Sequence, residues 1–461
     1  MNEILRSVLK HVKPTPADRK RIKLVAAELI ERTDAACAKL GIDAKAMLVG
    51  SAARNTWLRS ERDIDIFILL PEELPREEFE RQGLAVAWEV AGKRGKESFA
   101  EHPYVTMRLK GFDVDLVPCY DIAKPSEIRS AVDRSPHHQR YVKERLKLGL
   151  ADEVLLLKQF MSGAGVYGAE LRVQGFSGYL CELLVLHYGS FEKLVESASR
   201  WRSGVVIDPE RSYADEAEPR ALFEEQSLIM IDPVDASRNV GAAVSMQNFA
   251  TFIRACQDFV QKPGKQFFFP RPVRRLSARE IQATLERRET ALFCVVFSPP
   301  DVVPDVLFPQ LRKAERALAA RLARAGFGVV RSDVWSNSHA LILFELAVAK
   351  LSRVRTHVGP PISIEVGDFI HTHLKSGRKF AGPFVDAAGR LVFEIEREQA
   401  RAREVLEQAL GERTTLGKHV GEAIARKYRI YKGKEIVQLC RDKKVRAFIS
   451  EYLTRCLPWY R

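Results

Sequence analysis

One short stretch of the sequence, residues 50–70, sets the tightest limits on what the chain can form. It contains Gly50 and Ser51, and then Asp63 and Asp65 at the head of an apolar run. Side chains two residues apart on a strand point to one face, so both carboxylates can share divalent cations while isoleucines turn toward a core. The glycine lets backbone N–H groups approach a triphosphate, and the serine adds a hydroxyl donor. A solvated acidic edge strand is the plainer alternative; the joined pattern favours metal-dependent nucleotidyl transfer.

A third carboxylate is expected, because two cations around a triphosphate need more than two protein ligands. Residues 104–110 and 112–120 both have strand composition, and Gly111 separates them, which predicts a hairpin. Asp113 and Asp115 share one face of the second strand. Asp115 lies deeper in the apolar run, where an unpaired carboxylate is costly. We therefore predict that Asp115 is the metal ligand and that Asp113 is a rim residue.

Several longer segments carry a resemblance to a known family. They are Gly50-Ser51-Ala52-Ala53-Arg54-Asn55-Thr56-Trp57-Leu58, Asp63-Ile64-Asp65, Glu101-His102-Pro103-Tyr104, Val114–Tyr120, Ser135-Pro136-His137-His138, Val166–Glu170, Gly175–Glu182 and Asp232–Val240. On these segments the chain resembles the archaeal-type CCA-adding enzymes, which are class I tRNA nucleotidyltransferases of the polymerase β superfamily. The resemblance is dense over the first 260 residues and looser over the remainder.

This resemblance implies a reaction and a set of site residues. The 3′-hydroxyl of a tRNA would attack the α-phosphate of CTP or ATP and release pyrophosphate, so that the terminal CCA is added or repaired without a template. The carboxylates that would hold two Mg²⁺ ions are Asp63, Asp65 and Asp115. The residues that would line the incoming nucleotide are Ser51, Arg54, His138, Lys158 and Tyr167. Arg238 would present its guanidinium to the edge of cytosine or adenine.

The residues themselves leave some of these roles open. Lys158 lies in an apolar helical stretch, where it could equally extend its ammonium group to water. Arg238 alone would be an ordinary surface arginine. Two positions also depart from the family pattern: the first carboxylate, often Glu, is Asp63 here, and a pair of histidines is matched only by His138 followed by Gln139.

The whole composition narrows the classes of partner. The formal net charge is +13 and the pI is about 9.4, which favours a polyanion such as RNA. No stretch is apolar for long enough to cross a membrane, and the N-terminus has no signal-peptide core, so we expect a cytoplasmic protein. Seven cysteines without Cys-x-x-Cys spacing argue against a zinc site, and His371 and His373 are more typical of structural histidines.

The predicted fold class is a multidomain α+β protein. The expected domains are a polymerase β-type nucleotidyltransferase head over 1–134, a helical, nucleobase-reading neck over 135–262, and an RNA-binding body and tail over 263–461. In the last of these, a strand at 292–297 is followed by a long helix and two more strands, which suggests a ferredoxin-like or RNA-recognition-type sheet. Beyond 398 the chain is basic and is predicted to be a helical tail.

The expected partners are tRNA, bound through its acceptor and T stems, and the substrates CTP and ATP. No membrane is expected, and a homodimer is left open. One rival hypothesis is another RNA-tailing enzyme, such as a poly(A) or poly(U) polymerase, which would share the head chemistry. The other is an RNA-binding protein with a decayed active site, and the three intact carboxylates argue against it.

Overall fold

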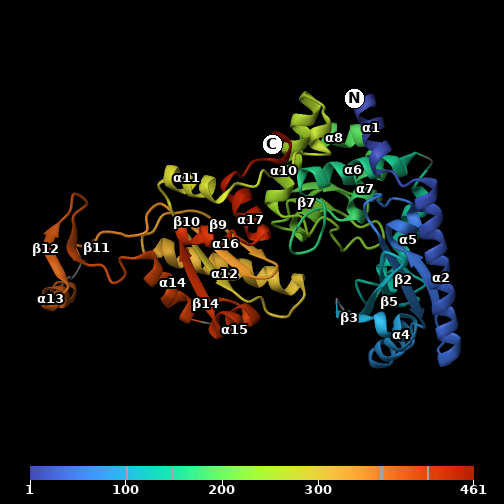
Figure 1. The fold of residues 1–461 in the computed structure, drawn as a ribbon, viewed down its shortest axis with the longest axis horizontal. Helices are drawn as coiled ribbons and strands as arrows, with labels where there is room; N and C mark the ends of the chain where they lie inside the picture. Colours follow the sequence, from blue (N-terminus) through green and yellow to red (C-terminus); the bar gives the residue numbers. More distant parts are fainter. Residues whose placement is uncertain (100–101, 148, 364–366, 413–414) are drawn as a thin grey trace. The chain divides into compact units, whose positions relative to one another are not determined.

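The computed structural model describes residues 1–461 apart from 100–101, 148, 364–366 and 413–414 (Figure 1). These residues form two compact units. The first unit comprises Met1–Pro272 together with Cys456–Arg461, and the second comprises Val273–Arg455. The chain therefore leaves the first unit, builds the second, and returns.

The first unit contains a five-stranded sheet with the strand order β1-β2-β5-β4-β3. Its strands are β1 (Lys45–Val49), β2 (Asp63–Leu70), β3 (Lys96–Phe99), β4 (Pro103–Leu109) and β5 (Phe112–Tyr120). β2 and β5 run parallel, whereas β4 and β5 form an antiparallel hairpin. The strand predicted after Gly50 and Ser51 and the predicted hairpin are both confirmed.

Strict alternation along β2 decides which face of the sheet carries the acidic residues. Ile64, Ile66 and Ile68 are fully buried and pack against α2 (Pro16–Leu40) and α4 (Arg76–Ala91). Because successive side chains on a strand point to opposite faces, the neighbouring aspartates lie on the other side of the sheet. The apolar core thus fixes the direction of the carboxylates.

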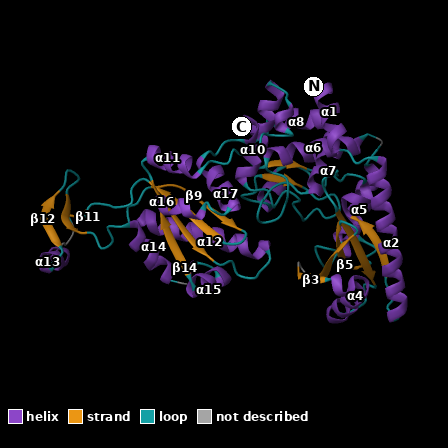
Figure 2. Ribbon diagram, viewed as in Figure 1, coloured by secondary structure: helices purple, strands orange, loops and turns teal. Residues whose placement is uncertain are grey.

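The rest of the first unit is mainly helical (Figure 2). Its helices are α1 (Asn2–Val12), α3 (Gly50–Arg54), α5 (Arg134–Arg145), α6 (Leu150–Ala164), α7 (Gly178–Tyr188), α8 (Phe191–Ala198), α9 (Ala217–Leu222) and α10 (Met246–Gln261). Two short parallel strands, β6 (Val205–Ile207) and β7 (Leu228–Met230), lie between α8 and α10 in the chain. Buried phenylalanines, including Phe160, Phe191 and Phe259, hold these helices together.

The returning segment of the chain is fastened to α10 by one carboxylate. Within the short helix η5 (Pro458–Tyr460), the Trp459 indole N–H donates to Asp258 at 2.8 Å and the Tyr460 hydroxyl donates to it at 2.6 Å. Arg254 forms an ion pair with the same carboxylate at 2.6 Å. Trp459 also stacks on Phe267 and is part of the first unit's core.

The second unit is built around a four-stranded antiparallel sheet with the strand order β14-β8-β10-β9. Its strands are β8 (Ala291–Phe297), β9 (Val329–Ser336), β10 (Ala340–Leu346) and β14 (Tyr428–Lys432). Its helices are α11 (Ala278–Arg288), α12 (Pro304–Arg324), α14 (Ala402–Gly411), α15 (Lys418–Arg426), α16 (Lys434–Leu439) and α17 (Lys443–Leu453). The predicted strand, long helix and two strands of this region are confirmed.

Two parts of the second unit differ from the sequence prediction. The region beyond 398 is not wholly helical, because β14 interrupts it and pairs with β8; Ile430 is buried there while its neighbours Arg429 and Tyr431 are not. A second sheet of β11 (Val354–Pro361), β12 (Lys379–Val385) and β13 (Arg390–Glu396), with α13 (Gly367–Lys375), was not predicted. Among the described residues, none of the helices combines the length and the apolar character needed to cross a lipid bilayer.

Candidate active site

The three predicted metal ligands lie on two neighbouring strands of the first unit's sheet. β2 and β5 pair in parallel so that Asp63 lies beside Asp113 and Asp65 lies beside Asp115. Paired residues of parallel strands point to the same face, and the two deeper carboxylates therefore face one another. Asp63 and Asp113, at the start of the two strands, are exposed, and Asp113 forms an ion pair with Arg108 at 3.6 Å.

Burial and mutual repulsion act on these carboxylates in the same direction. Burial, with the nearby charge of Asp115 added, raises the pKa of Asp65 to about 7. Burial, with the charge of Asp63 added, raises the pKa of Asp115 to about 6. Burial also raises the pKa of Asp63, and Glu61 contributes to the shift. Clustered carboxylate oxygens of this kind are the donors that hard divalent cations prefer, so the residues fit a divalent metal. Within the described part of the chain, no group of three or more acidic, histidine or cysteine side chains is arranged closely enough to hold a metal ion by itself.

The turn before these strands is shaped by Gly50. Its φ is +73°, a left-handed conformation that suits glycine, and a Cβ built on it would lie 2.2 Å from Oδ2 of Asp65. This glycine was expected to let the backbone approach a phosphate, and in the structure its lack of a side chain also makes room for the Asp65 carboxylate. Ser51 follows in the first turn of α3.

Two cavities meet at the carboxylates. The first, of about 380 Å³, is lined by Ser51, Arg54, Glu61, Asp63, Asp65, Asp113, Asp115, Lys158, Tyr167, Gly178, Tyr179 and Glu182. The second, of about 420 Å³, is lined by residues that include Gly50, Arg54, Asp65, His102, Asp115, His138 and Tyr179. Eight of the nine predicted site residues therefore line one or both cavities, and Arg238 lines neither. Glu101, part of one resembling segment, lies outside the described residues.

Arg54 is held rigidly by two residues of the helical region. Its Nε donates to Oε1 of Glu182 at 3.0 Å, and its NH1 donates to Oε1 of Gln139 at 2.7 Å. Glu182 is fully buried and also accepts from the Thr56 hydroxyl. Gln139, the residue that departs from the family's histidine pair, thus supports the guanidinium. The sequence analysis did not single out Glu182, although a glutamate within the apolar run of α7 was a signal.

Lys158 and Tyr167 converge on a second acidic residue. The Tyr167 hydroxyl donates to Glu61 at 3.0 Å, and the Lys158 ammonium lies 3.9 Å from the other oxygen of the same carboxylate. Lys158 is 1% exposed, so it does not extend to bulk water. Burial, with Glu61 adding to it, raises the pKa of Tyr167 far above its usual value, which keeps its hydroxyl a donor. Glu61 was not predicted to belong to the site.

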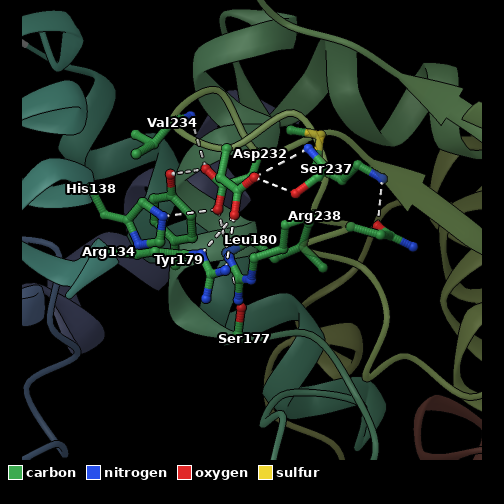
Figure 3. Close-up of polar contacts among 12 residues, drawn as sticks. Arg134, His138, Ser177, Tyr179, Leu180, Asp232, Val234, Ser237 and Arg238 are labelled. Atoms are coloured by element: carbon green, nitrogen blue, oxygen red, sulfur yellow. Dashed lines mark hydrogen bonds and ion pairs between the residues drawn. The ribbon is translucent and has the colours of Figure 1, made fainter. Parts of the chain in front are cut away.

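His138 and Arg238 are brought together by Asp232, a third carboxylate that the sequence analysis did not assign to the site (Figure 3). Oδ2 of Asp232 lies 2.9 Å from His138 Nε2 and 2.6 Å from Arg238 NH1. Burial lowers the pKa of His138, although the hydrogen bond to Asp232 acts against the shift. Burial alone would raise the pKa of Asp232, but the hydrogen bonds that it accepts bring it below its ordinary value.

Three protein-family models match the chain. A nucleotidyltransferase domain matches residues 30–138, the second domain of tRNA nucleotidyltransferase matches residues 152–269, and the C-terminal domain of CCA-adding enzyme matches residues 288–433. The α+β head of the first unit therefore has the nucleotidyltransferase fold.

Curated relatives match nearly the full length. CCA-adding enzymes of Methanosarcina acetivorans and Methanosarcina barkeri are each 42% identical, over 97% and 98% of both chains respectively. The CCA-adding enzyme of Halobacterium salinarum is 42% identical over 94% of this chain and 95% of its own. A solved structure of the Cid1 poly(U) polymerase matches with a TM-score of 0.46 and 14% identity, over 58% of this chain and 97% of that one.

Proposed function

Because the chain belongs to the family of CCA-adding enzymes, we propose that the two joined cavities are where its nucleotide meets the 3′ end of tRNA. As a tRNA nucleotidyltransferase of that family, the chain adds and repairs the 3′-terminal CCA from CTP and ATP and releases pyrophosphate. The observation that carries the placement of the site is the pairing of Asp65 with Asp115 beside the Gly50 turn.

Nucleotidyltransferases of this kind use divalent metal ions, and we assign Mg²⁺ to Asp63, Asp65 and Asp115. When bound, two such ions would lower the pKa of the attacking hydroxyl and stabilise charge on the leaving pyrophosphate. The protein carboxylates supply only part of a ligand set, so triphosphate oxygens are the natural source of the remainder.

The cationic and hydroxyl groups around the first cavity have the chemistry of a triphosphate site. Ser51 offers a hydroxyl, and Arg54 offers a guanidinium whose direction is set by Glu182 and Gln139. The Tyr167 hydroxyl donates to Glu61 and the Lys158 ammonium forms an ion pair with it at 3.9 Å, and phosphate oxygens could take the place of that carboxylate. These groups would orient the α-phosphate for in-line attack.

The nucleobase belongs, in this proposal, on the side of His138 and Arg238. The head would comprise residues 1–134, the neck 135–262, and an RNA-binding body and tail 263–461, with the four-stranded sheet of the second unit as a recognition-type body. tRNA would be bound through its acceptor and T stems. The cytoplasmic location and a homodimer stay predictions.

One experiment tests the activity directly. The protein is incubated with a tRNA that ends before CCA, with Mg²⁺, and with CTP and ATP singly and together. We expect two C residues from CTP alone, a terminal A only after both, and then a stop. Long homopolymeric tails, or no incorporation, would contradict the function.

A second substrate series separates this activity from general RNA tailing. A minihelix that keeps only the acceptor and T stems should be extended almost as well as whole tRNA, because double-stranded RNA is recognised mainly by shape. A single-stranded RNA with the same 3′ end should be a poor substrate. Equal extension of both would favour a tailing polymerase instead.

A further inference from the structure

Both carboxylate oxygens of Asp232 accept hydrogen bonds. The residue is fully buried and lies two residues beyond the end of β7. Besides His138 and Arg238 on Oδ2, its Oδ1 accepts from the Val234 backbone N–H at 3.0 Å and from the Tyr179 hydroxyl at 3.3 Å (Figure 3). Four donors around one ionised carboxylate form a complete set of partners, and their geometry depends on the negative charge at the centre.

This arrangement determines where the proton of His138 lies. An ionised carboxylate can only accept, so Nε2 of His138 must carry hydrogen. When the imidazole is neutral, Nδ1 is then a hydrogen-bond acceptor. Nδ1 makes no hydrogen bond to any other described residue, and His138 lines the second cavity beside Asp65 and Asp115. The nitrogen left for a ligand is therefore an acceptor.

Arg238, which bonds to the same carboxylate, offers hydrogen-bond donors where His138 offers an acceptor. One of its nitrogens is bound to Asp232, and the remaining N–H groups of the guanidinium are donors. The loop that carries it is closed by two backbone bonds, Asp232 N–H to the Arg238 carbonyl at 3.0 Å and Arg238 N–H to the Asp235 carbonyl at 2.9 Å. The His138 ring is fixed as well, because it stacks on Tyr179 at 4.0 Å.

We propose that Asp232 is a positioning residue that makes His138 and Arg238 an acceptor–donor pair for the base edge that cytosine and adenine share. Both bases present an exocyclic amino donor beside an acceptor ring nitrogen. Uracil and guanine present a carbonyl beside a ring N–H, which is the reverse order. His138 Nδ1 accepts from the amino group and Arg238 donates to the ring nitrogen. The proposal rests on the assignment of these two residues to the nucleotide.

The proton position is tested first on the wild-type protein, with one variant used only to assign the signal. ¹⁵N spectra of the histidine-labelled, full-length protein distinguish a protonated imidazole nitrogen from a bare one, and the signal absent in His138→Gln identifies the ring. We expect hydrogen on Nε2 and a bare Nδ1 near neutral pH. Hydrogen on Nδ1 of a neutral ring would overturn the proposal.

The amino group is tested with nucleotide analogues. Purine ribonucleoside triphosphate is ATP without its 6-amino group, and it should be used about tenfold to a hundredfold less efficiently than ATP. In His138→Phe, which keeps a ring against Tyr179 but has no nitrogen, that preference should largely vanish. If His138→Phe still prefers ATP by the wild-type factor, another group reads the amine.

The role of Asp232 is tested by Asp232→Asn, since an amide N–H must then face one of the four donors. The KM for CTP and ATP should rise about tenfold or more while kcat changes less, and UTP should be rejected less well. In a His138→Phe/Arg238→Ala background the same change should add little, because it acts through those two residues. Fully multiplying effects would contradict a positioning role.

Asp235→Asn is the matched control. Asp235 is three residues away and its carboxylate bonds Arg134 and Ser237, with no hydrogen bond to His138 or to the Arg238 guanidinium. Nucleotide preference should be unchanged. If Arg238→Ala alone leaves preference unchanged, the assignment of the nucleotide site fails, while the proton position on His138 still decides what Asp232 does.

Discussion

Two clusters of aspartate in the same unit show how differently the fold can treat one side chain. On β2 and β5, Asp65 and Asp115 face each other with too few protein donors, and both pKa values lie well above the ordinary range. After β7, Asp232 is buried more deeply, yet four donors surround it and its pKa is lowered. We propose that a metal ion and substrate complete the first cluster, whereas all four donors to the second come from the chain itself.

This difference in pairing indicates that the two clusters have different roles. Carboxylates that repel one another lower the stability of the fold, but they can take part in chemistry because a cation or substrate can supply the missing partner. A carboxylate that is fully paired orders its neighbours and has no capacity left for a ligand. In the function proposed above, an incomplete cluster of aspartates positions the reacting phosphate, and a fully paired aspartate positions the groups that contact the base.

The largest expected effect comes from breaking the incomplete cluster. Asp65→Asn or Asp115→Asn should reduce incorporation of both C and A by at least about a thousandfold, because the metal ligands act on the chemical step. Affinity for tRNA, measured by filter binding, should be nearly unchanged. Without divalent ions the free energy of unfolding should be equal to or above that of the wild type, since a repulsion is removed. Wild-type incorporation by either variant would remove it from the metal site.

The next largest effect is expected on stability, when the fully paired carboxylate is changed. Asp232→Asn should lower the free energy of unfolding by about 2–4 kcal/mol, because it unbalances a buried charge network. Denaturant unfolding with tRNA absent measures this loss directly. A stability equal to that of the wild type would mean that the four donors find new partners and do not depend on the charge of Asp232.

The two clusters should also respond oppositely to pH. Asp65 and Asp115 have folded pKa values of about 7 and about 6, above the usual 3.8, so the folded state binds more protons than the unfolded state between these values. Their contribution to stability is therefore present at low pH and is lost as pH rises from about 4 toward 7. For Asp232 the folded pKa is lowered, so its contribution is present at higher pH and is lost in acid.

Thermal unfolding in chelator over this pH range measures the difference. The stability of Asp65→Asn relative to wild type should increase as pH rises, and that of Asp232→Asn should decrease. Parallel curves for the two variants would show that the clusters do not differ in the way proposed.

The smallest effect is expected at the exposed neighbour. Asp113 occupies the same face of β5 as Asp115, but it is exposed and paired with Arg108. Asp113→Ala should change the free energy of unfolding by less than about 0.5 kcal/mol and should retain most of the activity. A loss comparable to that of Asp115→Asn would place Asp113 among the metal ligands.

The part of the site that could be predicted from sequence is the part that depends on residues close together in the chain. Alternation along residues 63–70 gave the strand and its acidic face, and the glycine gave the turn. The three carboxylates that we propose as metal ligands could therefore be selected from the sequence, and the resemblance supplied the residues of the helical region. In the second unit, alternation also indicated the strands β8 and β10.

What could not be predicted depends on partners that are distant in the chain. Asp232 bonds a histidine 94 residues away, and Glu182 bonds an arginine 128 residues away. No periodicity connects such pairs. The second sheet was missed for another reason: glycine and proline interrupt its strands, as at Gly359 and Gly382–Pro383, and hide the alternation. β14 is five residues long and lies among basic residues, two of them its own, so it was predicted to be part of a helical tail.

The return of the chain to α10 has a consequence for how the protein is made. Trp459 and Tyr460 belong to the first unit, yet the ribosome translates them only after the whole of the second unit. During synthesis, Asp258 lacks its indole and phenol donors until 201 and 202 further residues, respectively, have been added. The nascent first unit therefore lacks both hydrogen bonds and the Trp459–Phe267 stack until the second unit has been synthesised, and a premature stop anywhere in the second unit leaves both units incomplete.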